Sequence, residues 1–118
     1  MPSELLKVSN HKFVNVIELF LPEDLDSTEF DRLNEGLDAA LSNQSGDRWI
    51  LDLKQVEYMG SAALGLMVNI RQRVKSQSGK LALCNMSPRL LQIFKTCCLE
   101  RLFTITRTRD DAVKALGR

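Results

Sequence analysis

The sequence is poor in the residues that build metal centres and disulfide frameworks. Its 118 residues include one histidine and only three cysteines, at Cys84, Cys97 and Cys98. An odd number of cysteines, without a C-x-x-C pair or a neighbouring histidine, predicts neither a zinc site nor a disulfide scaffold and is typical of a reducing compartment. Because free cysteine packs as a small apolar residue, we expect all three thiols to be buried.

The sequence also lacks an excess of charge and any long apolar run. Sixteen basic residues against fifteen acidic ones leave a net charge of +1, which provides no field for attracting nucleic acid or an anionic membrane. The longest apolar stretch, residues 62–68, is far shorter than the roughly 18 residues of a spanning helix. Residues 1–4 carry no basic segment of a signal peptide. We therefore expect a cytoplasmic protein that neither binds nucleic acid nor inserts directly into a membrane.

What is present is the composition of an ordinary globular protein. Hydrophobic residues make up 44% and charged residues 26% of the chain, which argues against a disordered protein. The length also lies in the usual range for one domain, roughly 100–150 residues. We predict a single domain over residues 1–118.

Segments with the periodicity of strands alternate with segments of helical periodicity. Strands are predicted at residues 5–8, 13–21, 49–53, 80–85 and 102–106, with a turn at 10–12 between the first two. Helices are predicted at residues 26–41, 63–78, 88–94 and 110–116. Such alternation favours parallel neighbours joined by right-handed crossovers. The predicted fold class is α/β, with a mixed sheet of four to five strands, a parallel core and about four helices packed on it.

Local signals place the central strand and two helix starts. Residues 49–53 form a nearly continuous apolar run, which is typical of a strand buried on both faces. Asp26 stands three residues before Glu29, a capping pattern for the first helix. Ser87 precedes Pro88, which predicts an N-cap followed by proline at the first helical position.

The connection after the central strand, residues 56–65, is where an open α/β sheet places its site. Gly60 and Gly65 have the glycine spacing of a phosphate-binding loop. However, Leu66 and Met67 stand where that loop needs its lysine and its hydroxyl, so no side chain there can bind terminal phosphates or magnesium. Nucleotide hydrolysis is therefore not predicted.

Ser61 does not fit a catalytic nucleophile either. A G-x-S-x-G elbow requires glycine where the chain has Met59 and Ala63. The only histidine, His11, falls in the predicted turn near the amino terminus, where it is poorly placed to serve as the base of a triad. We therefore expect no enzyme activity, no cofactor and no metal.

Ser61 instead fits the target of another enzyme. A phosphate on a hydroxyl at a helix start adds about −1.5 to −2 charges beside free backbone N–H groups. The helix dipole would stabilise that phosphate, while its charge could repel a partner. The alternative is that Ser61 is simply the N-cap of the helix.

The helix after Ser61 also suggests a docking surface. Its main apolar stripe consists of Ala63, Met67, Ile70 and Val74. At about 100° per residue, Leu64 and Val68 lie roughly 90–130° away from that stripe, so we expect them to be exposed beside Ser61. The alternative is a helix with a wide buried face.

Residues 49–65, from Trp-Ile-Leu-Asp-Leu through Met-Gly-Ser-Ala-Ala-Leu-Gly, resemble the signature of the STAS family (sulphate transporter and anti-sigma-factor antagonist). That signature is an apolar strand ending in Asp-Leu, a short link, and then aromatic-apolar-Asp-Ser-Ser-Gly-Leu-Gly. Leu25-Asp26 resembles the family's Leu-Asp before its first helix, and residues 85–116 resemble its last helices and strand. The resemblance covers nearly the whole chain.

The resemblance implies a binding module that is switched by phosphorylation. Stand-alone members bind an anti-sigma factor, often one that is also a serine kinase, and phosphorylation of a serine at this helix start ends the binding. Ser61 matches the first serine of the motif, whereas Ala62 replaces the second, which accepts the phosphate in the best-known version. Gly60 replaces the aspartate and Ala63 the glycine. Ser61 is thus the phosphorylation candidate, and Asp26 matches an acidic residue that the fold brings toward it.

These arguments define a predicted switch loop and partner-binding surface. Its members are Asp26, Tyr58, Met59, Gly60, Ala62, Leu64 and Val68. We expect a monomer or a weak dimer. The alternative function within the family is a subunit that docks on a membrane lipid-transport ATPase without phosphorylation, and the loss of the usual acceptor at Ala62 favours it.

Overall fold

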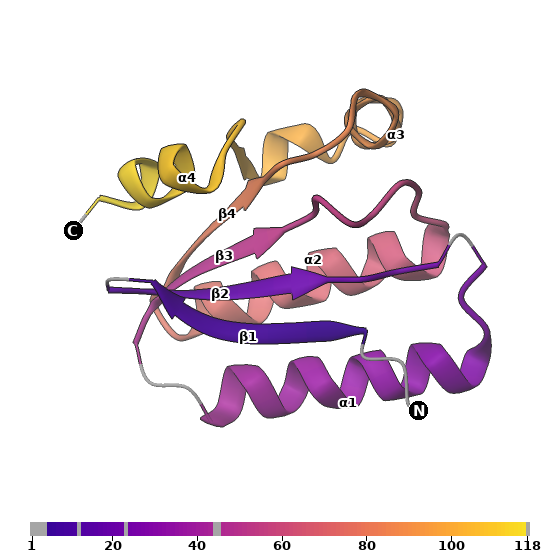
Figure 1. Cartoon of the computed structure of the whole chain (residues 1–118), viewed down its shortest axis with the longest axis horizontal. Coiled ribbons are helices and arrows are strands. Elements are labelled where there is room, and N and C mark those ends of the chain that lie inside the picture. The colour runs from indigo at the N-terminus through magenta and orange to yellow at the C-terminus, as the bar shows by residue number, and fades with distance from the viewer. Residues whose placement is uncertain (1–4, 12, 23, 44–45, 118) are drawn as a thin grey trace.

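The chain builds a five-stranded sheet in the order β1-β2-β3-β4-β5 (Figure 1). The structure, a computed structural model, describes residues 5–11, 13–22, 24–43 and 46–117. The strands are β1 (Leu6–His11), β2 (Val14–Leu19), β3 (Arg48–Asp52), β4 (Lys80–Cys84) and β5 (Thr104–Ile105). β1 pairs with β2 in antiparallel fashion, and each later pair is parallel. The predicted mixed sheet with a parallel core is confirmed.

Helices cover both faces of this sheet. They are α1 (Ser27–Asn43), α2 (Ser61–Ser76), α3 (Pro88–Thr96) and α4 (Arg109–Leu116), with a 3₁₀ turn, η1, at Glu100–Leu102. Buried residues of α1, α2 and α3 share one core cluster, whereas those of α4 pack in a second cluster. From β2 to β5 each crossover advances one strand in the same direction. Crossovers of one hand must then place their helices on the same face.

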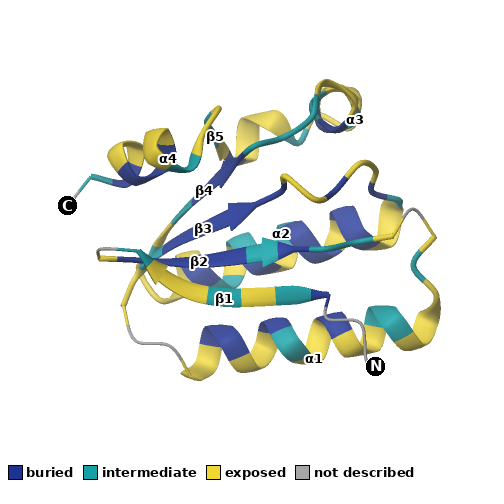
Figure 2. Cartoon of the chain, in the orientation of Figure 1, coloured by how far each residue is buried: buried dark blue, intermediate teal, exposed yellow. Residues whose placement is uncertain are grey.

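The central strand separates the two core clusters. Trp49 and Leu51 of β3 pack with α1, α2 and α3, while Ile50 between them packs with α4. Successive side chains of a strand point to opposite faces, so the middle of a strand covered on both sides is apolar at consecutive positions, as residues 49–51 are. Figure 2 shows β3 as mostly buried, and only its first residue, Arg48, is partly exposed. The prediction of a central strand is confirmed.

Side-chain caps begin three of the helices. In α1 the Glu29 backbone N–H donates to Asp26 Oδ1 at 2.8 Å, and the Asp26 N–H donates to Glu29 Oε1 at 3.1 Å. Ser87 Oγ accepts from Leu90 N–H at 3.1 Å, so both predicted caps are confirmed. Thr108 caps α4, which therefore begins at Arg109, one residue earlier than predicted.

Two predicted element boundaries are corrected. The last strand is much shorter than predicted, because Leu102 belongs to η1 and only two residues pair with β4. The first hairpin turn is tighter than predicted, because β1 continues through His11. Lys12, the last residue of the predicted turn, lies outside the described residues.

The expectation that all cysteines are buried is wrong for two of them. Cys84, at the end of central β4, is buried, but Cys97 and Cys98 are exposed. These two residues follow the last turn of α3, beyond its buried anchor Phe94. Both side chains lie at the surface beyond the last turn of α3, so the apolar character of cysteine does not bury them there.

Candidate functional site

The amino-terminal ends of α1 and α2 meet around a hollow of about 390 Å³. Both helices follow the carboxyl ends of neighbouring parallel strands, β2 and β3, so both begin at the same edge of the sheet. The lining residues are Leu21, Pro22, Asp24, Leu25, Asp26, Tyr58, Met59, Gly60, Ser61, Ala62 and Ala63. The hollow thus brings together the predicted switch loop and the predicted acidic residue.

Ser61 lies in this hollow as the first residue of α2 and is exposed. The N-cap is Gly60, whose carbonyl accepts a hydrogen bond from Leu64 N–H at 3.0 Å. The alternative that Ser61 is the N-cap is therefore wrong. Its hydroxyl makes no hydrogen bond to any residue that the structure describes.

Asp26 contributes a negative charge to the same hollow. Its side chain is exposed and caps α1, as described above. With Asp24, which also lines the hollow, it places two carboxylates on the side facing the α2 N-terminus. Because like charges repel, a phosphate on Ser61 would be repelled by these two carboxylates, whereas an uncharged hydroxyl is not.

Replacing Asp26 with alanine is expected to lower the free energy of unfolding by about 1 kcal/mol, because α1 loses its N-cap. Urea denaturation monitored by circular dichroism measures the change. Asp24→Ala is the matched control, since it removes a neighbouring exposed carboxylate that caps no helix, and should stay within about 0.5 kcal/mol of the parent protein. Equal effects of the two substitutions would contradict the capping role.

Four further predicted site residues lie at the surface near Ser61. Tyr58 is 36% exposed, and the Arg89 guanidinium carbon lies 5.2 Å from the centre of its ring. Ala62 is exposed, and Gly60 and Val68 are partly exposed. An aromatic ring under an arginine presents a broad amphipathic surface of the kind that protein interfaces favour.

Met59 and Leu64 are corrections to the predicted surface. Met59 is 2% exposed and Leu64 is 9% exposed, and both belong to the main core cluster. Leu66 is buried as well. α2 packs against both α1 and the sheet, so its buried face is wider than the single stripe predicts. The alternative of a wide buried face is the correct one, and the buried side chains of Met59 and Leu64 do not form part of the exposed surface.

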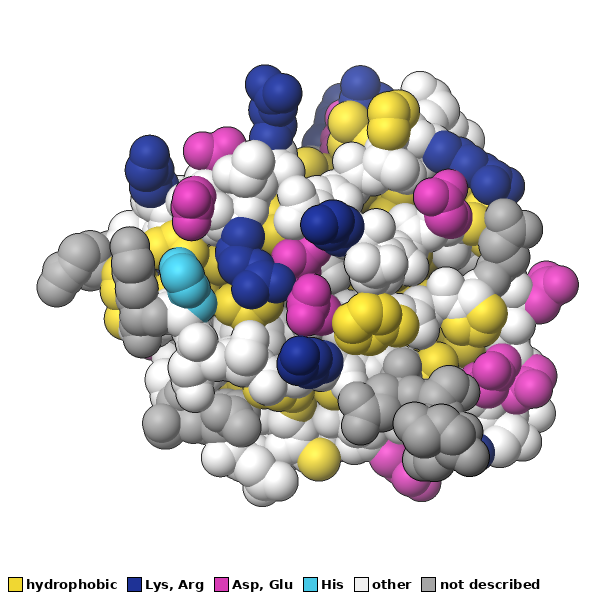
Figure 3. All heavy atoms as spheres, in the orientation of Figure 1, with side chains coloured by type: hydrophobic (Ala, Val, Ile, Leu, Met, Phe, Trp, Pro, Cys, Tyr) yellow, Lys and Arg dark blue, Asp and Glu magenta, His cyan; other side chains and the backbone are white. Residues whose placement is uncertain are grey.

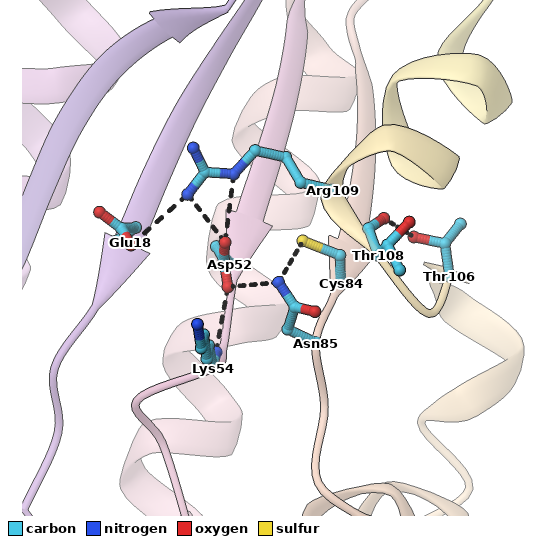
Figure 4. A network of polar contacts seen from close by, with 8 residues as sticks. All are labelled: Glu18, Asp52, Lys54, Cys84, Asn85, Thr106, Thr108 and Arg109. Atoms are coloured by element: carbon cyan, nitrogen blue, oxygen red, sulfur yellow. Dashed lines mark hydrogen bonds and ion pairs between the residues drawn. The ribbon is translucent and has the colours of Figure 1, made fainter.

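A second polar cluster lies on the other face of the sheet, beneath α4 (Figure 4). Asp52 ends β3 and is 3% exposed. Its Oδ2 accepts from Arg109 Nη2 at 2.8 Å and Nε at 3.2 Å. Its Oδ1 accepts from Asn85 Nδ2 and from the Lys54 backbone N–H, both at 3.1 Å. Arg109 Nη2 also lies 3.4 Å from Glu18 Oε2.

This cluster ties α4 to the ends of three neighbouring strands. Glu18 is the next-to-last residue of β2, on the face that carries the buried Val14 and Val16. Asp52 ends β3, and Asn85 follows β4 in a left-handed conformation with φ of 59°. Sequence periodicity does not single out these residues. The one available signal is Asp52 itself, a charged residue that ends an otherwise apolar strand.

The surroundings of this cluster change the acidity of two groups. Burial, reinforced by the negative charge of Asp52, raises the pKa of Cys84 from 9.0 to about 12. The hydrogen bonds that the Arg109 guanidinium donates to Asp52 raise the pKa of that guanidinium above its ordinary value. Cys84 is therefore an inert thiol, and Arg109 stays charged wherever the protein is folded.

The buried Cys84 thiol is expected to make the protein sensitive to alkali. Its folded-state pKa is raised, so its contribution to stability is complete below the ordinary thiol value of 9.0 and is lost as pH rises toward about 12. Up to about 1.4 kcal/mol per pH unit is at stake in that window. Urea unfolding of Cys84→Ala should show a shallower loss of stability above about pH 9 than the parent protein. The exposed Cys97→Ala is the control, and equal slopes for Cys84→Ala and the parent protein would contradict the assignment.

The visible surface shows no concentration of one charge sign. In Figure 3 basic and acidic side chains alternate across the face, and apolar side chains appear in separate small patches. Within the described ranges, no three histidine, cysteine or acidic residues are placed to hold a metal ion. No helix there is both long enough and apolar enough to cross a membrane.

Comparison with known proteins gives a consistent picture. The sequence model of the STAS domain matches residues 8–112. The anti-sigma-B factor antagonist of Bacillus subtilis is 33% identical over 100 residues, which cover 85% of this chain and 90% of that protein. The anti-sigma F factor antagonist of Paenibacillus polymyxa is 23% identical over 94% of this chain and 91% of its own. A solved STAS domain protein of Planctomyces limnophilus superposes with a TM-score of 0.81 at 26% identity, covering 96% of this chain and 98% of its own.

Proposed function

This chain belongs to the STAS domain family, and from that premise we propose that it is an anti-sigma-factor antagonist. It would bind an anti-sigma factor that is also a serine kinase, and phosphorylation of Ser61 would end the binding. The observation that carries the proposal is that Ser61, the first residue of α2, is exposed and that its hydroxyl does not cap the helix. Such a protein is a regulatory binding module rather than an enzyme, and its partner would place it in the cytoplasm.

The position of Ser61 suits a switch that leaves the fold intact. A phosphate there lies at the positive end of α2, where the helix dipole stabilises it by about 0.3–1 kcal/mol. The same phosphate adds about −1.5 to −2 charges to a hollow that already holds Asp24 and Asp26. A partner seated over the hollow would then meet a concentrated negative charge. Since 1.4 kcal/mol corresponds to tenfold in affinity, modest repulsion is enough to release it.

The partner surface that we propose surrounds this hollow. Tyr58, Gly60 and Ala62 are accessible on the α2 side, and Asp26 is accessible on the α1 side. Val68 lies about two turns beyond Ser61 on the same side of α2 and is partly exposed. A large aromatic residue at the centre and small residues beside it would let a partner approach the α2 N-terminus closely.

A second candidate function rests on Ala62. In the family motif that residues 59–65 resemble, Ala62 stands at the position of the second serine, and alanine has no hydroxyl. A STAS subunit that docks on a membrane lipid-transport ATPase needs no phosphorylation and would tolerate alanine there. In that case the same surface would bind the ATPase constitutively.

Affinity capture of the tagged protein from its native lysate, followed by mass spectrometry of bait and partners, separates the two functions. Recovery of an anti-sigma factor with a kinase fold, together with phosphate on Ser61, is the result expected for the switch. A Ser61→Ala bait should retain that partner even in the presence of ATP. Recovery of a transport ATPase with unmodified bait would replace the first proposal with the second.

A further inference from the structure

The carboxyl end of α3 presents two neighbouring thiols to solvent. Cys97 and Cys98 are both exposed, whereas Cys84 is buried. Neither exposed cysteine lines the hollow around Ser61. The proposed switch makes no use of these thiols, so they call for an explanation of their own.

Cys98 occupies a backbone position that normally belongs to glycine. Its N–H donates to the Lys95 carbonyl at 3.0 Å, and the next residue, Leu99, donates to the Phe94 carbonyl at 2.8 Å. This is the pair of hydrogen bonds that closes a helix through a left-handed residue. Cys98 has that conformation, with φ of 60°. A side chain costs roughly 1–2 kcal/mol there, which glycine avoids.

The turn that carries the two thiols is anchored on both sides. Phe94 is fully buried and meets Phe103 with ring centres 5.8 Å apart. Leu99 packs against the same core cluster. Because these anchors hold the backbone on both sides, the turn that carries the two adjacent thiols is ordered.

Two thiols on adjacent residues are better suited to clamp one soft atom than to form a disulfide. Neighbouring Cα atoms across a trans peptide bond lie about 3.8 Å apart, below the usual range of about 4.4–6.8 Å for a disulfide. A larger atom bridging the two sulfurs relaxes that restraint. Sulfur ligands also select soft, thiophilic centres over hard ones.

We propose that Cys97 and Cys98 form a dithiol site for a trivalent arsenical. With an organoarsenic oxide, two As–S bonds form and the arsenic–oxygen bond breaks. Both thiol protons leave with that oxygen as one molecule of water, and arsenic remains trivalent throughout. The second sulfur attaches within one molecule, which typically strengthens binding by about 10²–10⁴-fold over a single attachment.

The test is titration of the full chain with phenylarsine oxide in a buffer whose reductant is not a thiol. Intact mass and the count of free thiols are the readouts. We expect one arsenic per chain and the loss of two thiols. We expect a dithiol competitor, 2,3-dimercaptopropanol, to remove the arsenic, and an excess of 2-mercaptoethanol to leave it in place. Cys97→Ser and Cys98→Gly should each weaken binding at least about 100-fold.

Two variants control for misfolding and for reaction of the buried thiol. Cys98→Gly places the favoured residue in the left-handed position, so loss of binding by this variant cannot be attributed to misfolding. Cys84→Ala removes the buried thiol and should bind as the parent protein does. Unchanged binding by Cys97→Ser and Cys98→Gly, one arsenic on each separate thiol, or arsenic bridging two chains would overturn the proposal.

Discussion

Replacing Arg109 with alanine is expected to lower the free energy of unfolding by about 3 kcal/mol. The substitution leaves the Asp52 carboxylate, 3% exposed, without the two N–H groups that its Oδ2 accepts. Breaking a buried pair by removing one partner typically costs about 3–5 kcal/mol. The lower end applies because the Arg109 side chain is 33% exposed, so water can reach the vacated position. For a domain whose total stability is about 5–15 kcal/mol, this is a large loss.

Urea denaturation measures this effect, and two variants test its cause. Arg101→Ala removes an exposed arginine elsewhere on the surface and should change stability by less than about 0.5 kcal/mol. Adding Asp52→Asn to Arg109→Ala removes the uncompensated charge, so the double variant should be more stable than Arg109→Ala alone. If Arg109→Ala were no more destabilising than Arg101→Ala, the cluster would contribute nothing to holding α4 on the sheet.

Replacing Ser61 with aspartate or glutamate is expected to weaken partner binding at least tenfold. The substituted carboxylate mimics part of the phosphate charge in the hollow that already contains Asp26. Placing like charges against one another at an interface costs several kcal/mol. The fold should survive, because a negative charge at the first position of α2 interacts favourably with the helix dipole. Isothermal titration with the captured partner measures the affinity.

Two further variants separate the switch from a general effect of charge. Ser61→Ala should bind like the unmodified protein and stay bound when ATP is added. Ser78→Asp makes the same chemical change just beyond the other end of α2, at an exposed residue whose left-handed backbone aspartate tolerates. It should leave affinity unchanged. Normal binding by Ser61→Asp and Ser61→Glu would reject the switch and leave the family assignment untouched.

Partner binding and the α4 cluster lie on opposite faces of the sheet, so their effects should separate. Arg109 belongs with α4, whereas Ser61 starts a helix on the other face. A folded Arg109→Ala protein should therefore keep its affinity for the partner, and Ser61→Asp should keep its stability. We expect this independence because Ser61 and Arg109 share no contact among the described residues, and sites without shared contacts usually act additively.

Local sequence patterns were enough to predict the architecture of this protein. Alternating strand and helix periods predicted the mixed sheet, the apolar run at residues 49–53 predicted its centre, and the pairs Asp26–Glu29 and Ser87–Pro88 predicted two helix starts. Each of these signals depends on residues within one or two turns of each other. The motif around Ser61 likewise identified the family, because its residues are contiguous.

The three-dimensional packing of the elements sets which residues are exposed at the surface and which are buried in the core. It buried Leu64, because α2 packs against both α1 and the sheet, and it buried Met59 in the same core cluster. It exposed Cys97 and Cys98, which follow the last turn of α3. It also places Ser61 in the same hollow as Asp26, and it pairs Asp52 with Arg109, 57 positions further along the chain. Burial and long-range pairing depend on how complete elements pack together, and no window of neighbouring residues contains that information.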